Sequence, residues 1–380
     1  MTIDLRAPAA LLLSGSLLLG PAGLALPAAV AAEPAPEASA PVYVSPDLGP
    51  GTPAPEPVAD AWIVADLDSG EAFAAHEIEA GRAPASVIKL LTALALVEEL
   101  DDPEQVYVPV FEDMAVDGTK AGIVRENEYT IDDLFHAMIM SSANDAAHAL
   151  GNVVGGQEEA VRLMNDKAAE LGLTGTVART TSGLDAPGQV TTVADQMIVA
   201  AAFLEDDYLM DIARTEVYDF PGATDPDTGV RTEGYQIGNR TRVVGEVDGG
   251  IGLKNGYTEE ARGSFVAVVE RDGRTLGSAV LTSENNTRRA ALDLIDWAFN
   301  QEDPAVVDTV QLTPEPTAEP TTAAPSPNPT PEVGANAADA DPAGAGLDPR
   351  ILLGAAGLVV LAGGIGFIVL RRRGGAAGRG

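Results

Sequence analysis

Hydrophobic and polar positions along residues 58–302 follow two different periods. Near the start, the apolar residues 62–65 and 72–74 flank a turn at Gly70, which predicts a β-hairpin. Near the end, residues 264–270 and 276–282 flank the turn Asp272-Gly273 and predict two more strands. Strands at both ends of the domain predict one sheet built from distant segments.

The middle of this region has helical periodicity instead. We expect helices over residues 86–100, 131–153, 158–171 and 192–204, and a closing helix over 287–300. The first of these is apolar nearly all round, which is typical of a buried central helix. Together with the strands, this pattern predicts an α/β (α+β) domain in which helices cover the sheet.

The N-terminal segment has the pattern of a targeting signal. Residues 9–19 are mainly apolar, and the small residues Ala29-Val30-Ala31-Ala32 follow them. This arrangement predicts a cleaved secretory signal over residues 1–32, although an uncleaved anchor is an alternative. Residues 33–57 are rich in proline and predict a spacer ahead of the domain.

The C-terminal segment predicts a membrane anchor. Residues 351–370 carry no charge, and Arg371, Arg372 and Arg373 follow them directly. Such a segment predicts a transmembrane helix with a basic cytoplasmic tail, residues 371–380, and places the domain that precedes it outside the cell membrane. A buried core helix is an alternative, but such a helix is not expected to end at three arginines. A sortase-type wall signal is another, but no L-P-x-T-G motif precedes this segment. Residues 303–349, rich in Pro, Thr and Ala, predict a stalk between domain and membrane.

Composition narrows the chemistry. The 380 residues include 57 acidic and 23 basic side chains, which argues against nucleic acid as a partner. The chain has no cysteine, which excludes disulfides and thiolate chemistry, and only three histidines. These histidines have no metal-ligand spacing and are interpreted as packing or surface residues. We therefore expect no metal and no cofactor, and the absence of a G-x-S-x-G elbow argues against a Ser-His-Asp triad.

Three short motifs carry candidate chemistry. Ser86 and Lys89 are three residues apart at the start of the central helix, so a neutral Lys89 amine can take the Ser86 proton. Burial in an apolar helix lowers the pKa of a lysine, as a base requires. Alone, the pair is explained at least as well by Ser86 as a helix cap and Lys89 as a surface lysine.

The second motif is Ser141-Ser142-Ala143-Asn144-Asp145, and the third is Lys254-Asn255-Gly256-Tyr257-Thr258. The second places a hydroxyl and an amide where a turn can present both to one cleft, although an ordinary Asx turn is the alternative. In the third motif, the glycine allows a substrate backbone to approach a strand closely.

Together and in this order, the three motifs resemble the S-x-x-K, S-x-N and K-T-G set of the serine penicillin-recognising enzymes. The surrounding residues, including Ser182-Gly183-Leu184-Asp185, are similar to one branch, the D-alanyl-D-alanine carboxypeptidases among the low-molecular-mass penicillin-binding proteins. This resemblance implies the β-lactamase/transpeptidase-like fold, an antiparallel sheet with helices on it beside an all-helical lobe.

The resemblance also implies roles for individual residues. Ser86 is expected to attack the carbonyl between two D-alanines of a peptidoglycan stem peptide, with Lys89 as general base and Ser142 as the proton donor to the leaving amine. Asn144 is expected to hold the peptide backbone of the substrate, and Lys254 to attract its terminal carboxylate. Asn255, Gly256 and Tyr257 are also expected to bind substrate, and the backbone amides of Ser86 and Tyr257 to hold the oxyanion. β-Lactam antibiotics are then expected to acylate Ser86.

One position departs from the family pattern, because Asn255 stands where the third motif has Thr or Ser. A carboxamide donates to a carboxylate but cannot relay a proton. A weakened or inactive homologue that binds wall peptide is therefore an alternative. A β-lactamase is another, although residues 174–185 lack the glutamate that activates the deacylating water in class A enzymes.

Overall fold

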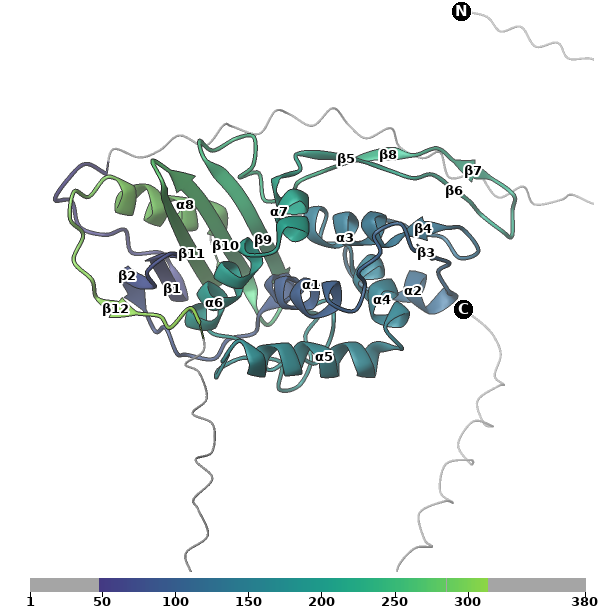
Figure 1. The fold of residues 1–380 in the computed structure, drawn as a ribbon, viewed down its shortest axis with the longest axis horizontal. Helices are drawn as coiled ribbons and strands as arrows, with labels where there is room; N and C mark the ends of the chain where they lie inside the picture. Colours follow the sequence, from purple (N-terminus) through teal and green to yellow (C-terminus); the bar gives the residue numbers. More distant parts are fainter. Residues whose placement is uncertain (1–47, 285, 314–380) are drawn as a thin grey trace, which may run out of the picture. The chain divides into compact units, whose positions relative to one another are not determined.

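The computed structural model describes residues 48–284 and 286–313, so the predicted signal, membrane helix and basic tail lie outside the described residues. An antiparallel sheet of six strands in the order β12-β2-β1-β11-β10-β9 forms the centre (Figure 1). Its strands are β1 (Ala59–Asp66), β2 (Glu71–His76), β9 (Gly250–Thr258), β10 (Arg262–Arg271), β11 (Arg274–Ser283) and β12 (Asp308–Thr309). The first and last parts of the described chain therefore pair in one sheet.

Alternate side chains of the strands enter two separate cores. In β1, Ile63 packs with the large helical core, whereas Trp62 and Val64 pack on the other face. Helix α8 (Thr287–Phe299) covers that second face through Leu292 and Ile295. Both faces of the central strands are therefore buried.

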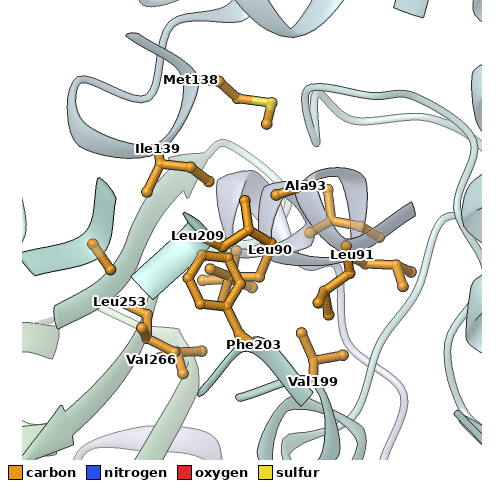
Figure 2. Close-up of a cluster of buried hydrophobic side chains, with 14 of the residues drawn as sticks. Leu90, Leu91, Ala93, Met138, Ile139, Val199, Phe203, Leu209, Leu253 and Val266 are labelled. Carbon is orange, nitrogen blue, oxygen red and sulfur yellow. The ribbon is translucent and has the colours of Figure 1, made fainter. Parts of the chain in front are cut away.

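The helices fill the opposite side of the sheet and extend beyond it (Figure 1). Helix α1 runs through the middle of this layer and is surrounded by apolar residues of α3, α6, α7 and the sheet (Figure 2). The helices are α1 (Lys89–Val97), preceded by the 3₁₀ turn η1 (Ala85–Ile88), then α2 (Phe111–Ala115), α3 (Ile131–Met140), α4 (Asn144–Val153), α5 (Gln157–Glu170), α6 (Val193–Leu204) and α7 (Asp207–Arg214). Burial of α1 on all sides fixes its N-terminal turn in space.

A long two-stranded arm extends over α3 (Figure 1). The arm consists of two pairs of strands, β5 (Val217–Phe220) with β8 (Tyr235–Gly238) and β6 (Ala223–Thr224) with β7 (Arg231–Thr232). Hydrogen bonds from Asn127 to Thr224 and from Tyr235 to Ala121 fasten it to the segment before β4 (Tyr129–Thr130), the partner of β3 (Val106–Tyr107). The predicted all-helical lobe thus also contains these short strands.

The predicted strands, the helices at 158–171, 192–204 and 287–300 and the sheet of distant segments are confirmed. The single helix predicted over 131–153 is wrong, because residues 141–143 separate α3 from α4 and Ser142 has φ +63. A non-glycine residue in this region interrupts helical hydrogen bonding. No helix among residues 48–284 and 286–313 is long and apolar enough to cross a membrane.

The domain also continues past both predicted boundaries. Strand β12 pairs with β2 inside the segment predicted to be stalk, and Val310 is buried in the helical core. On the other side, Trp297 Nε1 donates to Thr52 O at 2.9 Å, within the predicted spacer. Periodicity cannot reveal such short pairings, because two residues are too few to show a period.

Candidate active site

The N-terminal turn of α1 carries the first two predicted residues. Ala85, the first residue of the turn η1, has φ +49; this turn presents Ser86, and Lys89 begins α1. One helical turn separates the two side chains, and Lys89 Nζ lies 2.9 Å from Ser86 Oγ. An amine at this distance can exchange a proton with the hydroxyl directly.

Lys89 is fully buried and makes two other polar contacts. Its Nζ donates to Asn144 Oδ1 at 2.8 Å and to the backbone carbonyl of Ser182 at 2.5 Å. Burial, and next the charge of Lys254, lower the pKa of Lys89 well below its ordinary value, while Asp145 opposes this shift. A neutral amine is therefore favoured at the Ser86 hydroxyl.

The Ser182 carbonyl is a functional group that the sequence analysis did not identify. It accepts from Lys89, and Ser86 Oγ lies 3.4 Å away from it. Gly183 has φ +81, and a Cβ there would lie 2.0 Å from the Ala85 carbonyl oxygen, so only glycine permits this approach. The motif Ser182-Gly183 thus marks a backbone contact, which side-chain chemistry alone does not indicate.

The second motif forms the connection between α3 and α4. Asn144 is held at three points, because its backbone N–H donates to Thr119 O at 2.7 Å, its Nδ2 donates to Asp117 O at 2.8 Å, and its Oδ1 accepts from Lys89. Ser142 is 7% exposed, and no described residue is a hydrogen-bond partner of its hydroxyl. The Ser142 hydroxyl is therefore available to a ligand.

Asp145, the last residue of this motif, has a structural role. Its buried carboxylate accepts backbone N–H groups of residues 121–123 at 2.7 to 3.1 Å. These bonds fix the residues that follow Asp117 and Thr119, whose carbonyls hold Asn144. The negative charge also raises the pKa of Lys89, so Asp145 contributes to both the position and the charge of the site.

The third motif lies on β9, an edge strand of the sheet. Lys254 is fully buried, its Nζ donates to the Asn255 carbonyl at 2.8 Å, and burial together with Arg240 lowers its pKa to about 7. A Cβ at Gly256 would lie 2.5 Å from the Ser86 backbone nitrogen, so glycine allows β9 to approach the nucleophile turn closely. Tyr257 is 68% exposed.

Asn255 is the position at which the third motif departs from the family pattern. Its Oδ1 is buried and has no hydrogen-bond partner among the described residues. Rotating the carboxamide would exchange an unpaired acceptor for an unpaired donor, so the cost of an unsatisfied polar atom remains.

The structure brings the three motifs together at one place. Hydrogen bonds connect Lys89 with Ser86 and Asn144, and Gly256 adjoins Ser86. Ser142 is two residues from Asn144 in the sequence, and the charge of Lys254 acts on Lys89. The three histidines lie elsewhere: His148 pairs with Asp113, His136 stacks on Tyr218, and His76 stacks on Trp62. Among the described residues no group of three or more His, Asp or Glu side chains is arranged to hold a metal ion.

Comparison with known proteins gives a consistent result. Residues 50–285 match the peptidase S11 family, described as D-alanyl-D-alanine carboxypeptidase. The chain is 36% identical over 254 residues to the D-alanyl-D-alanine carboxypeptidase DacB2 of Mycobacterium tuberculosis, covering 65% of this chain and 84% of that protein. It is 30% identical to DacC of Escherichia coli, of which the match covers 62%.

Solved structures agree with this assignment. A crystal structure of a D-alanyl-D-alanine carboxypeptidase from M. tuberculosis superposes with a TM-score of 0.63 at 33% identity, over 70% of this chain and 100% of that one. The Streptomyces K15 DD-transpeptidase gives a TM-score of 0.60 at 20% identity, over 65% of this chain and 99% of the other, which shows the shared fold alone. The chain therefore belongs to the peptidase S11 family of D-alanyl-D-alanine carboxypeptidases.

Proposed function

We propose that the protein is a serine D-alanyl-D-alanine carboxypeptidase that removes the terminal D-Ala from peptidoglycan stem peptides through an acyl-enzyme on Ser86. One observation carries this proposal: Lys89 is fully buried with Nζ 2.9 Å from Ser86 Oγ. A neutral amine has two N–H donors and one lone pair. Asn144 Oδ1 and the Ser182 carbonyl can only accept, so they use both donors and leave the lone pair for the Ser86 proton.

In the first half of the reaction, Ser86 Oγ bonds to the carbonyl carbon between the two D-alanines as its proton passes to Lys89 Nζ. The oxyanion then rests on the N–H groups of Ser86 and Tyr257. Two features support this hole. Gly256 adjoins the Ser86 nitrogen, and the Asn255 carbonyl accepts from Lys254 at the free edge of β9, so the Tyr257 N–H two positions later points the same way.

In the second half, the C–N bond breaks and the leaving amine gains a proton through Ser142. The free hydroxyl of Ser142 suits this role, and Asn144 is fixed tightly enough to hold the peptide backbone of the substrate. Water then attacks the ester carbon, which releases the shortened peptide and restores Ser86. β-Lactams acylate the same hydroxyl in this scheme.

The β-lactamase alternative gains no support from the segment before the third motif. Asp185 is the only carboxylate in residues 174–185, and its Oδ2 accepts from the backbone N–H of Glu260 at 3.2 Å. This carboxylate is therefore engaged with the turn between β9 and β10 rather than with a water at Ser86. We expect a penicilloyl adduct to persist.

We also propose that the domain acts outside the cytoplasmic membrane, exported by residues 1–32 and anchored by residues 351–370. The uncharged run of 20 residues followed by three arginines supports this orientation. Fractionation of cells that express the full chain, followed by protease treatment of intact protoplasts, tests it. A domain that stays protected from protease would contradict the proposal.

The reaction is tested by D-Ala release from an N-acylated tripeptide that ends in D-Ala-D-Ala. We expect release by the wild type and none by Ser86→Ala or Lys89→Met. Ser278→Ala is the matched control, since Ser278 is a buried serine on β11 whose hydroxyl has no partner among the described residues. A folded wild type that releases no D-Ala would refute the proposed function.

A further inference from the structure

Residues 179–184 form a loop whose two ends are joined by one buried carboxamide. This carboxamide belongs to Gln189, which is 7% exposed. Its Oε1 accepts from the backbone N–H groups of Arg179 and Thr180 at 3.1 and 3.0 Å, and from Thr180 Oγ1 at 3.1 Å. Its Nε2 donates to Leu184 O at 2.8 Å. One side chain therefore determines the shape of the whole loop.

The Ser182 carbonyl, which accepts from Lys89, lies in this stretch, so we call residues 179–184 the carbonyl loop. Thr180 Oγ1 donates to the buried carboxamide and accepts the backbone N–H of Gly183 at 3.0 Å. That N–H and the Ser182 carbonyl belong to one planar trans peptide group, in which they point in opposite directions. A hydrogen bond at the N–H therefore fixes the direction of the carbonyl.

Helix α1 contacts the carbonyl loop through two adjacent carbonyls. Thr92 Oγ1 donates to Thr181 O at 2.9 Å, and Lys89 Nζ donates to Ser182 O. Lys89 and Thr92 are three residues apart, so their side chains lie on one face of the helix. The loop is thus held between α1 and the carboxamide of Gln189.

The direction of the Ser182 carbonyl decides what Lys89 can do. A neutral amine has two N–H donors and one lone pair, and Asn144 Oδ1 and the Ser182 carbonyl take the two donors. If this carbonyl turned away, the amine would be free to rotate, and its lone pair would no longer be directed at Ser86 Oγ. A displacement of about 1 Å between reacting groups can lower a rate by roughly a hundredfold.

We propose that Gln189 is a positioning residue for acylation, which acts through Thr180 to point the Ser182 carbonyl at Lys89. This inference rests on the proposed function, in which Lys89 takes the proton of Ser86. The side-chain hydrogen bonds of Gln189 end on the carbonyl loop, so its effect on the base passes through the Ser182 peptide group.

The test separates the binding of a penicillin from the acylation that follows. Stopped-flow labelling at increasing concentrations of a fluorescent penicillin gives a dissociation constant for the first complex and a limiting rate constant for acylation. We expect Gln189→Met to lower the limiting rate constant by roughly ten- to a hundredfold, with little change in the dissociation constant. A role in stability alone would change neither constant in the folded protein.

Gln196→Met is the matched control. Gln196 is also a buried glutamine, but it lies on α6, and its Nε2 donates to Thr191 Oγ1, outside the carbonyl loop. This variant loses a buried carboxamide as Gln189→Met does, and it should keep the wild-type limiting rate.

A second variant tests the route through the hydroxyl. Thr180→Val keeps the shape of the side chain but removes the group that binds the Gly183 N–H, so it should also slow acylation. Because both changes break one network, their effects should not multiply. The double variant with Gln189→Met should be about as slow as the slower single variant.

Thermal unfolding shows which variants are folded, and if Gln189→Met does not fold, Thr180→Val decides by the same criterion. A folded variant of either kind with the wild-type limiting rate would overturn the inference, while labelling of the wild type would leave the proposed function intact. An equal loss in Gln196→Met, or losses that multiply in the double variant, would also overturn it. A folded wild type that is not acylated would instead refute the proposed function and, with it, the premise of this inference.

Discussion

Lys89 combines a buried amine with two acceptors that are fixed from separate elements. The spacing of Ser86 and Lys89 in the sequence predicted their contact, and the distance of 2.9 Å agrees with it. The Ser182 carbonyl could not be predicted in the same way, because a backbone carbonyl is present at every residue and has no signature of its own. The only sign of this contact in the sequence is Gly183, whose φ of +81 allows the chain to approach Ala85 closely.

The charge of Lys254 should control the pH at which Lys89 becomes a base. Lys254 disfavours the protonated form of Lys89, so Lys254→Gln raises the pKa of Lys89 and lowers the fraction of neutral amine at a given pH. The ascending limb of acylation rate against pH should therefore move to higher pH. The shift is expected below about pH 7, because the pKa of Lys254 is about 7 and its amine carries a charge only below that pH. Rates of penicillin acylation between pH 5 and pH 9 measure it, and a limb that moves to lower pH would contradict this electrostatic account.

Asn255 is expected to lower stability, because its buried carboxamide oxygen has no partner among the described residues. Asn255→Thr replaces the unsatisfied group with a smaller hydroxyl that rotates toward a partner, and should raise the free energy of unfolding by about 1 kcal/mol or more. Denaturant unfolding of both proteins measures the difference, with D-Ala release as the functional readout. A destabilised variant would show that the carboxamide has a favourable contact.

The helical pattern predicted where the helices lie, but it did not predict where one helix ends and the next begins. The apolar residues of α3 and α4 share a helical period, so the sequence favours one helix through residues 141–143. The break depends on tertiary contacts: Asn144 and Asp145 bond the loop of residues 117–123, and these long-range bonds stabilise the turn at Ser142. Local propensity contains no information about them.

The arm escaped prediction for a related reason. Its strands are short and largely exposed, and they lack the alternation that marks a half-buried strand. Two buried apolar residues, Phe220 and Ile237, pack it into the helical core, and specific bonds add to this, including the ion pair of Arg125 with Asp227 at 2.7 Å.

Asp145 should affect both the stability of the helical lobe and the pKa of Lys89 in the active site. Asp145→Asn leaves some of the N–H groups of residues 121–123 without an acceptor, which should cost about 2 to 4 kcal/mol of unfolding free energy. It also removes a negative charge that raises the pKa of Lys89. We therefore expect a less stable protein whose acylation limb moves to lower pH. Unchanged stability in a denaturant titration would show that the loop is held by other contacts.

At the scale of the whole molecule, the sequence predicted that strands come first, helices follow and strands close the domain. Its motifs also indicated the family. It placed the domain boundary too early, because β12 and Val310 lie in a segment of stalk-like composition. Their contribution comes from pairing with β2, at the opposite end of the domain in sequence, and from packing in the helical core. Composition reports neither contact.

Truncation at Glu302 should therefore destabilise the domain. It removes the burial of Val310 and the backbone bonds from Val307 to Ala72 and from Val310 to Gly70, each 2.8 Å long. Compared with a chain ending at Thr313, we expect the midpoint of thermal unfolding to fall by roughly 3 to 8 °C. Equal midpoints in calorimetry would show that β12 contributes nothing to stability.

The central claim is that Ser86 is a nucleophile activated by Lys89. The most direct measurement incubates the described domain, residues 48–313, with a fluorescent penicillin and follows covalent labelling on a denaturing gel, beside Ser86→Ala and the control Ser278→Ala. The account predicts a persistent label on the wild type and on Ser278→Ala, none on Ser86→Ala, and penicilloyl mass on the peptide that contains Ser86. A folded wild type without label, or a label that persists in Ser86→Ala, would contradict it.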